Sequence, residues 1–235
     1  MPRNHHFARA FTLIELLVVV AIIAILISIA YPVYTGILER GKLTQDMNNL
    51  RQIGLGIQIY LNDNDQILPA TTTAWPGTTA APALYPKYIS SRKVFQSPFD
   101  KRPSSEAGDG TPPVSYGINA NVYILVAATP PGIVRNMTRV VSLASTILIA
   151  PRFNGNPATA SAWPGTAGNA PALPPGGAGG GIAEALGTHA NGTRINAFFC
   201  DLHTESLTFG PSSTAGTFQD TTSDPLGLKH WDPTK

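Results

Sequence analysis

The sequence predicts an α+β protein in which one long N-terminal helix packs against a small antiparallel β-sheet with long loops rich in proline and glycine. Three observations support this prediction. The run from Phe11 to Ala30 is almost wholly apolar and, as a helix, is about 30 Å long, the thickness of a bilayer core. Helical spacing of apolar residues continues beyond Pro32. After Gln66, short alternating segments are separated by proline and glycine clusters.

The residues before the apolar run are basic. Met1 to Ala10 contain Arg3 and Arg9 and no acidic residue. The positive-inside rule therefore predicts a cytoplasmic N-terminus and a C-terminal domain on the other side of a membrane. The segment Ser28–Ala30 has the small-x-small form of a signal peptidase site, but the run exceeds an h-region of about 7–15 residues. We therefore expect a retained, single-pass membrane anchor.

A carboxylate, Glu15, lies near the start of this apolar run. A charged side chain costs about 2.5–3.5 kcal/mol at the centre of a membrane helix and less near its end. One interpretation is that Glu15 occupies the first helical turn, where the helix dipole favours an anion and the side chain reaches the headgroups. The other is that Glu15 has a specific partner.

The stretch from Arg9 to Val19, RAFTLIELLVV, resembles the type III signal of type IV pilins and type II secretion pseudopilins. The resemblance implies a pilin-like fold and cleavage by a prepilin peptidase between Ala10 and Phe11, followed by N-methylation of Phe11. Ala10 stands where the family normally has glycine. The resemblance also implies an inner-membrane location, with the C-terminal domain in the periplasm until the protein is assembled.

In this family the acidic residue at the position of Glu15 acts in assembly. Cleavage would leave an α-ammonium group on Phe11 in apolar surroundings, and Glu15 of a neighbouring subunit would neutralise it. The implied partners are prepilin peptidase, other pilin or pseudopilin subunits, an inner-membrane assembly platform and membrane lipid.

The domain organisation follows from these features. We expect a leader over 1–10, a helix over 11–62 and a β-rich periplasmic domain over 63–235. The helix divides into a membrane-spanning part, 11–31, and an amphipathic part, 32–62, and Pro32 is expected to bend it without ending it. The apolar face of the second part contains Leu43, Met47, Leu50, Gly54, Ile57 and Leu61.

Two further features of this second part bear on packing. Asp46 and Asn49 are assigned to its polar face. Gly54 and Gly56 weaken the helix by about 1 kcal/mol each relative to alanine, and we expect them to let the sheet approach closely.

Alternation and turn residues predict six strands and two short helical turns in the C-terminal domain. The expected strands are Val114–Ile118, Val122–Ala127, Val140–Ser142, Ile147–Ala150, Arg194–Cys200 and Thr204–Phe209. The helical turns are expected at Ala83–Tyr88 and Ser90–Val94. The segment Asn154–Gly181 is almost entirely Gly, Ala, Pro, Thr and Asn, which predicts a long loop.

Segments of this domain resemble a pilin-like group with an H-X9-DG element that is common in Planctomycetes and Verrucomicrobia. They are Val94–Asp100, Ser115–Asn119 and His189–His203. The chain departs from that pattern in three ways: eleven residues separate His189 from Asp201, Leu202 replaces glycine, and Ser97 stands where cysteine is frequent.

The predicted C-terminal hairpin offers a candidate metal site. Asp201, His203 and Glu205 are spaced by two and would share a face of an extended strand, and His189 would complete a ligand set for zinc or calcium. Alternatively, these polar residues face water at a hairpin tip. A second calcium candidate is the tail, where Asp220, Asp224 and Asp232 offer hard oxygen ligands, although packing of the tail by Trp231 is the favoured interpretation. No cofactor is expected overall.

Composition and missing motifs exclude several functional classes. The chain has 16 Lys and Arg against 14 Asp and Glu, and removal of a leader with two arginines leaves 14 of each. This balance argues against general nucleic-acid binding. Cys200 is the only cysteine, so an intrachain disulfide and a cysteine-rich zinc site are excluded. The sequence contains no Walker loop, nucleophile elbow or H-E-x-x-H motif, so we do not expect an enzyme.

Three functional interpretations remain open. The favoured one is a structural subunit of a type IV pilus or a type II secretion pseudopilus. The second is a minor or tip subunit that binds an exoprotein, a polysaccharide or DNA. The third is a membrane-anchored periplasmic enzyme, which predicts a convergent polar site that the sequence does not reveal.

Overall fold

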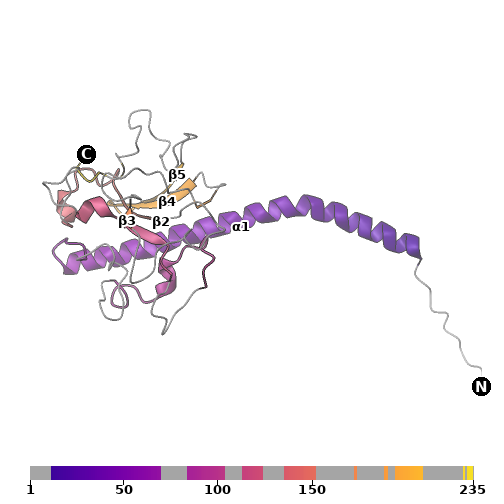
Figure 1. Ribbon diagram of the computed structural model, residues 1–235, viewed down its shortest axis with the longest axis horizontal. Helices are drawn as coiled ribbons and strands as arrows, with labels where there is room; N and C mark the ends of the chain where they lie inside the picture. The colour runs from indigo at the N-terminus through magenta and orange to yellow at the C-terminus, as the bar shows by residue number, and fades with distance from the viewer. Residues whose placement is uncertain are drawn as a thin grey trace, which may run out of the picture. The chain divides into compact units, whose positions relative to one another are not determined.

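The computed structural model describes residues 12–69, 84–103, 113–123, 135–151, 172–173, 188–189, 194–208, 230 and 232–234. The chain divides into two compact units, Met1–Gly41 and Lys42–Lys235. Helix α1, Leu13–Asp63, contributes residues to both units (Figure 1). The strands all belong to the second unit and are β1 Tyr116–Asn119, β2 Ile147–Pro151, β3 Ala172–Leu173, β4 Arg194–Phe199 and β5 Thr204–Thr208.

The predicted N-terminal helix is observed as the 51 residues of α1. Pro32 lies inside α1 and does not end it, so bending at Pro32 stays a prediction. The helix ends at Asp63, where the Gln66 amide donates to the Leu61 carbonyl at 2.9 Å and Asp65 and Gln66 both have positive φ. This left-handed turn closes the last carbonyls of the helix.

The sheet has the strand order β3-β1-β2-β4-β5. The pairs β1–β2, β2–β4 and β4–β5 are antiparallel, and β3 adds a short parallel pairing to β1. The hairpin β4–β5 pairs Asn196 with Ser206, and β1 pairs Gly117 with Ala150. The expected α+β, pilin-like arrangement, a long apolar helix on an antiparallel sheet, is therefore confirmed.

The second part of α1 packs on one face of this sheet. Its core residues are fully or almost fully buried against Tyr116, Ile118 and Phe198. They recur at helical spacing and are Leu50, Ile53, Ile57 and Leu61. The opposite face of the sheet carries a second buried cluster made of Ile147, Ala150, Ile195, Ala197, Phe199 and Leu207. The alternation of β4 between these two clusters explains the alternating pattern in its sequence.

Gly54 lets the sheet approach the helix closely, as expected, whereas Gly56 faces Ile89, which lies outside the strands. A Cβ atom at Gly54 would lie 2.1 Å from Cζ of Phe198, and one at Gly56 would lie 2.5 Å from Cγ1 of Ile89. Glycine at position 54 is therefore what permits the Phe198 ring of β4 to lie directly against the helix backbone.

Two of the expected strands are wrong where the structure describes them. Val122 belongs to a 3₁₀ helix, Ala120–Tyr123, because the Asn119 side chain accepts the Asn121 amide and turns the chain at the end of β1; residues 124–127 lie outside the described residues. Val140–Ser142 is not a strand. The Val140 amide donates to the Met137 carbonyl, and the Val141 amide donates to the carbonyl of Pro233 in the C-terminal tail.

The other strand expectations are confirmed within a few residues as β1, β2, β4 and β5. The helical turns are also present in the described residues, as the turn after Leu84 and as the 3₁₀ helix Arg92–Phe95, which Ser91 caps. Strand β3 was not expected, because it lies inside the segment Asn154–Gly181 and pairs with β1 far away in the sequence.

Candidate functional site

The start of α1 contains a capping box formed by Thr12 and Glu15. The amide and the hydroxyl of Thr12 donate to Oε2 of Glu15 at 2.9 and 2.8 Å. The Glu15 amide donates back to Thr12 Oγ1 at 3.2 Å. This reciprocal arrangement satisfies donors at a helix start. The expected cleavage residues, Ala10 and Phe11, lie outside the described residues.

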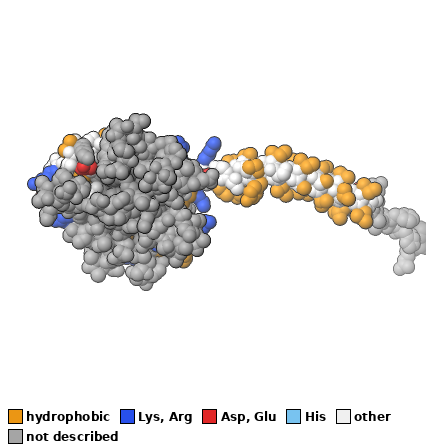
Figure 2. Space-filling view, turned by 45° about the horizontal axis from the view of Figure 1, so that its top comes forward, with side chains coloured by type: hydrophobic (Ala, Val, Ile, Leu, Met, Phe, Trp, Pro, Cys, Tyr) orange, Lys and Arg blue, Asp and Glu red, His pale blue; other side chains and the backbone are white. Residues whose placement is uncertain are grey.

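The first unit carries an exposed apolar helix surface. Its large apolar residues from Leu13 to Leu38 are all exposed, and Figure 2 shows apolar side chains along the visible face of this part of α1. By length and composition α1 is able to cross a membrane, and the most apolar 18-residue window has no buried residues. The Ser28 and Thr35 hydroxyls donate to the carbonyls of Ile25 and Pro32, so these polar groups are satisfied within the helix.

The apolar surface is longer than a membrane span requires. From Leu13 to Leu38 the helix rises about 38 Å at roughly 1.5 Å per residue, against a bilayer core of about 30 Å. Beyond Pro32 it still exposes Val33, Tyr34, Ile37 and Leu38.

The four residues of the expected hairpin metal site do not form one cluster. His203 contacts both carboxylates, with Nδ1 against Asp201 Oδ1 and Nε2 3.8 Å from Glu205 Oε2. Its ring stacks on Phe199, on the sheet face away from α1. His189 instead is buried, stacks on Phe99 and lies 3.3 Å from the Ser206 hydroxyl.

His189 and the other three residues lie on different faces of the sheet, so they do not surround one metal position. Ser206 is the neighbour of Glu205 on β5, so the two side chains point to opposite faces of the sheet. In the part of the chain that the structure describes, no three His, Cys, Asp or Glu side chains are placed to hold a metal ion.

The expected tail site is described only in part. Asp220 and Asp224 lie outside the described residues. Asp232 is buried, and its Oδ1 accepts the amide and hydroxyl of Thr234 at 2.9 and 2.6 Å. His230 Nδ1 lies 2.9 Å from the Ser145 carbonyl, which attaches the tail to the loop before β2.

A buried carboxylate that the sequence analysis placed on the polar face of the helix joins α1 to the sheet. Asp46 is fully buried. Its Oδ1 accepts the hydroxyls of Ser97 and Tyr116, both at 2.6 Å, and its Oδ2 accepts Nδ2 of Asn196 at 2.9 Å. Burial raises the pKa of the Asp46 carboxyl above its ordinary value, and the three hydrogen bonds oppose that shift.

The neighbouring turn of α1 extends this polar network. Asn49 Nδ2 donates to the Gln96 carbonyl at 3.0 Å. Assignment of Asp46 and Asn49 to the polar face is therefore wrong. The helical spacing indicates that Asp46 is buried, because Asp46 lies four residues before Leu50 and so falls on the apolar stripe.

A second polar network holds the segment before β1. The Ser115 hydroxyl donates to Asp100 Oδ2 at 2.7 Å and accepts the Ser97 amide at 2.9 Å. Arg102 binds both oxygens of the buried Asp100, with its closest nitrogen at 2.7 Å. Two of the segments noted in the sequence, Val94–Asp100 and Ser115–Asn119, are thus joined in space.

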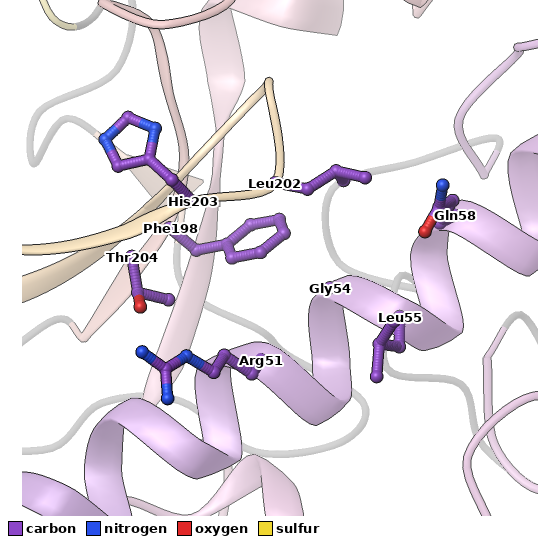
Figure 3. Close-up of a pocket in the computed structure, with 8 residues that line it drawn as sticks. All are labelled: Arg51, Gly54, Leu55, Gln58, Phe198, Leu202, His203 and Thr204. Carbon is purple, nitrogen blue, oxygen red and sulfur yellow. The ribbon is translucent and has the colours of Figure 1, made fainter.

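An open cleft lies between α1 and the β4–β5 hairpin (Figure 3). Its volume is about 380 Å³, and its lining consists of Arg51, Gly54, Leu55, Gln58, Phe198, Leu202, His203 and Thr204. Figure 3 shows the Phe198 ring facing the helix at Gly54, with Arg51 on one side and Leu202 on the other. Sequence reasoning did not find this cleft, because it joins residues about 150 positions apart.

Comparison with known proteins supports the interpretation of the N-terminus. Residues 6–31 match the family model described as the prokaryotic N-terminal methylation motif. No solved structure matches the chain. The matched residues include the capping box and most of the apolar helix surface of the first unit. The chain thus carries a prepilin-type N-terminal methylation motif, which implies processing by a prepilin peptidase, at the start of an apolar helix that packs on a pilin-like α+β domain.

Proposed function

We propose that this protein is a prepilin whose mature form is a structural subunit of a type IV pilus or a type II secretion pseudopilus. The observation that carries the proposal is the methylation motif over 6–31, which runs directly into the exposed apolar helix. In this proposal a prepilin peptidase cleaves between Ala10 and Phe11 and methylates the new N-terminus.

The protein is first an inner-membrane protein in this proposal. The leader with Arg3 and Arg9 stays in the cytoplasm, α1 crosses the bilayer, and the second unit lies in the periplasm. An assembly platform then transfers the subunit from lipid into a filament.

The apolar helix surface supports assembly as well as anchoring. Val33, Tyr34, Ile37 and Leu38 extend the exposed apolar surface beyond the length of a bilayer core. Apolar surface of this kind is stabilised when it is removed from water. In a filament the helices of neighbouring subunits bury the whole length, including the part that a bilayer does not cover.

Glu15 has two roles in this proposal. Within one subunit its Oε2 caps the helix through Thr12. In the part of the chain that the structure describes, Oε1 has no hydrogen-bond partner. We assign Oε1 to the methylated ammonium of Phe11 on a neighbouring subunit, which removes two isolated charges from apolar surroundings.

The first test is the mass and N-terminal sequence of the protein from membranes of a host with its prepilin peptidase. A chain that begins at N-methylated Phe11 is expected. A chain that still begins at Met1 contradicts the proposal and indicates a simple anchor. A chain that begins at Tyr31 indicates a cleaved signal peptide and also contradicts it.

The second test is electron microscopy of sheared surface material and periplasmic fractions from the same host. Filaments that contain the processed chain are expected. The unprocessed control is a double variant with alanine in place of Phe11 and an acidic residue in place of Ala10. These substitutions alter the bond that the peptidase cleaves and leave the described residues of the protein unchanged. Processing without filaments under overproduction would contradict a structural role.

A further inference from the structure

The cleft between α1 and the β4–β5 hairpin combines apolar walls with one unpaired charge. Phe198 and Leu202 supply apolar surface, and the Arg51 side chain lies on the helix beside them (Figure 3). Arg51 is exposed and has no ion-pair or hydrogen-bond partner in the described part of the chain. The volume of the cleft is about 380 Å³.

Leu202 is held in a conformation that disfavours its side chain. Its φ is 75°, in the left-handed region, where a residue with a Cβ is strained by about 1–2 kcal/mol. Leu202 is also 39% exposed at the turn between β4 and β5. Strained backbone conformations of this kind cluster at binding sites, where the strained side chain serves a contact.

The acidic residues of the hairpin do not neutralise the cleft. Asp201 and Glu205 both contact the His203 ring, which stacks on Phe199 on the sheet face away from α1. Arg51 therefore gives the cleft a local positive charge, and an acidic group next to an apolar side chain suits it best.

The turn that follows α1 has the complementary features. Asp65 is exposed and has no ion-pair or hydrogen-bond partner in the described residues. Its φ is 51°, in the left-handed turn that follows the helix. Two residues further on, Ile67 is 37% exposed. This turn thus presents an unpaired carboxylate and an apolar side chain within three residues.

We propose that the cleft binds the Asp65–Ile67 turn of a second copy of this chain, with Asp65 against Arg51 and Ile67 against Leu202 and Phe198. The inference rests on the proposed function and deepens it, since it names a contact between subunits. Cleft and turn are different surfaces of one chain, so the contact is heterologous, and it builds an open filament when its rotation does not close a ring. Arg51 and Asp63, the last residue of α1 before the turn, lie 12 residues apart. In a filament whose α1 helices run parallel, the contact therefore displaces neighbouring copies along the helix by about 18 Å.

The sharpest test is disulfide cross-linking of filaments made from the double variant Leu202→Cys, Ile67→Cys. A ladder of dimers, trimers and higher species is expected after mild oxidation. Each single cysteine variant is the matched control and is expected to give no ladder. The native Cys200 does not interfere, because burial raises the pKa of its thiol to about 12.

Charge exchange provides an independent test in the full-length protein. Arg51→Glu is expected to lower filament yield at least tenfold by repelling Asp65, and adding Asp65→Arg is expected to restore most of the yield. Arg51 and Asp65 are exposed and unpaired, so both variants are expected to keep their thermal stability. Filaments of Arg51→Glu at the unsubstituted level would overturn the inference, as would a double variant that stays folded without recovery.

The outcomes separate this inference from the proposed function. Filaments of the double cysteine variant without a ladder overturn the inference alone, because processing and assembly are intact. A ladder that stops at dimers overturns the heterologous contact. Failure of the unsubstituted chain to be processed or to form filaments overturns the proposed function and, with it, the inference.

Discussion

Asp46 of α1 and Asn196 of β4 are joined by a 2.9 Å hydrogen bond in the buried core, although 150 residues separate them in the sequence. The same carboxylate accepts the hydroxyls of Ser97 and Tyr116. One side chain thereby ties the helix to the segment before β1, to β1 and to β4. A buried polar group that lacks its hydrogen-bond partners costs free energy, so this network fixes the position and rotation of α1 on the sheet.

Replacement of Asp46 separates the role of its charge from that of its hydrogen bonds. Asp46→Ala leaves three buried donors without an acceptor and is expected to lower the free energy of unfolding by about 3 kcal/mol. Asp46→Asn keeps an acceptor for Ser97 and Tyr116. Once the Asn196 amide turns over, the new amide donates to Asn196 Oδ1, a buried atom that has no hydrogen bond in the described residues. We expect a change within about 1 kcal/mol. Chemical unfolding of the full chain in detergent measures both, and equal losses would contradict this account.

The same carboxylate predicts how stability depends on pH. Burial raises the pKa of Asp46 in the folded state above its ordinary value of 3.8. The folded protein therefore holds this proton more tightly than the unfolded chain does, so the contribution of Asp46 is fully present below pH 3.8 and is lost as pH rises through the folded pKa. The difference in unfolding free energy between the unsubstituted protein and Asp46→Asn is expected to fall as pH rises. A difference that is constant or that grows with pH would refute the prediction.

Gly54 is expected to be intolerant of a side chain. Gly54→Ala places a Cβ 2.1 Å from the Phe198 ring and is expected to cost about 1–3 kcal/mol despite the better helix propensity of alanine. Gly41→Ala is the matched control, since a Cβ there meets nothing within 4 Å beyond the adjacent helix backbone, and it is expected to stabilise the protein by up to about 1 kcal/mol. Thermal unfolding of both variants checks this; a Gly54→Ala protein as stable as Gly41→Ala would disprove the close packing.

Much of the fold is predictable from local sequence patterns, because α1 and the hairpin β4–β5 are specified by periodicity that each segment carries itself. Asp46 shows where such patterns need care, since its residue type indicated solvent while its spacing from Leu50 indicated the core. Strand β3 depends on pairing with a distant strand and has no local signal. The cleft at Arg51 and Leu202 has none either, because it exists only once helix and hairpin meet.

Glu15 variants distinguish charge from helix capping. Glutamine is able to occupy a capping box, so Glu15→Gln is expected to keep the Thr12 contacts and to insert and be processed normally. It leaves the ammonium group of the neighbouring subunit without a counter-ion, which costs about 3–5 kcal/mol of assembly free energy. Filament yield is therefore expected to fall by well over tenfold. Glu15→Val loses both functions and is expected to assemble no better. Processing is followed by mass and assembly by shearing; normal filaments from Glu15→Gln would leave capping as the only role of Glu15.

Substitutions of Leu202 separate an effect on stability from an effect on assembly. Leu202→Gly relieves the strain at φ 75° and is expected to raise the free energy of unfolding by about 1 kcal/mol. Leu202→Ala keeps the strain but removes the exposed side chain, and its stability is expected to stay within about 0.5 kcal/mol of the unsubstituted protein. Both variants lose the part of the apolar surface of the cleft that Leu202 supplies, so both are expected to lower filament yield. A glycine variant that is more stable and assembles normally would show that the strained leucine serves no contact. If both variants assemble poorly, stability is not the cause, because one variant gains stability and the other keeps it. The loss of assembly then arises from the missing leucine side chain.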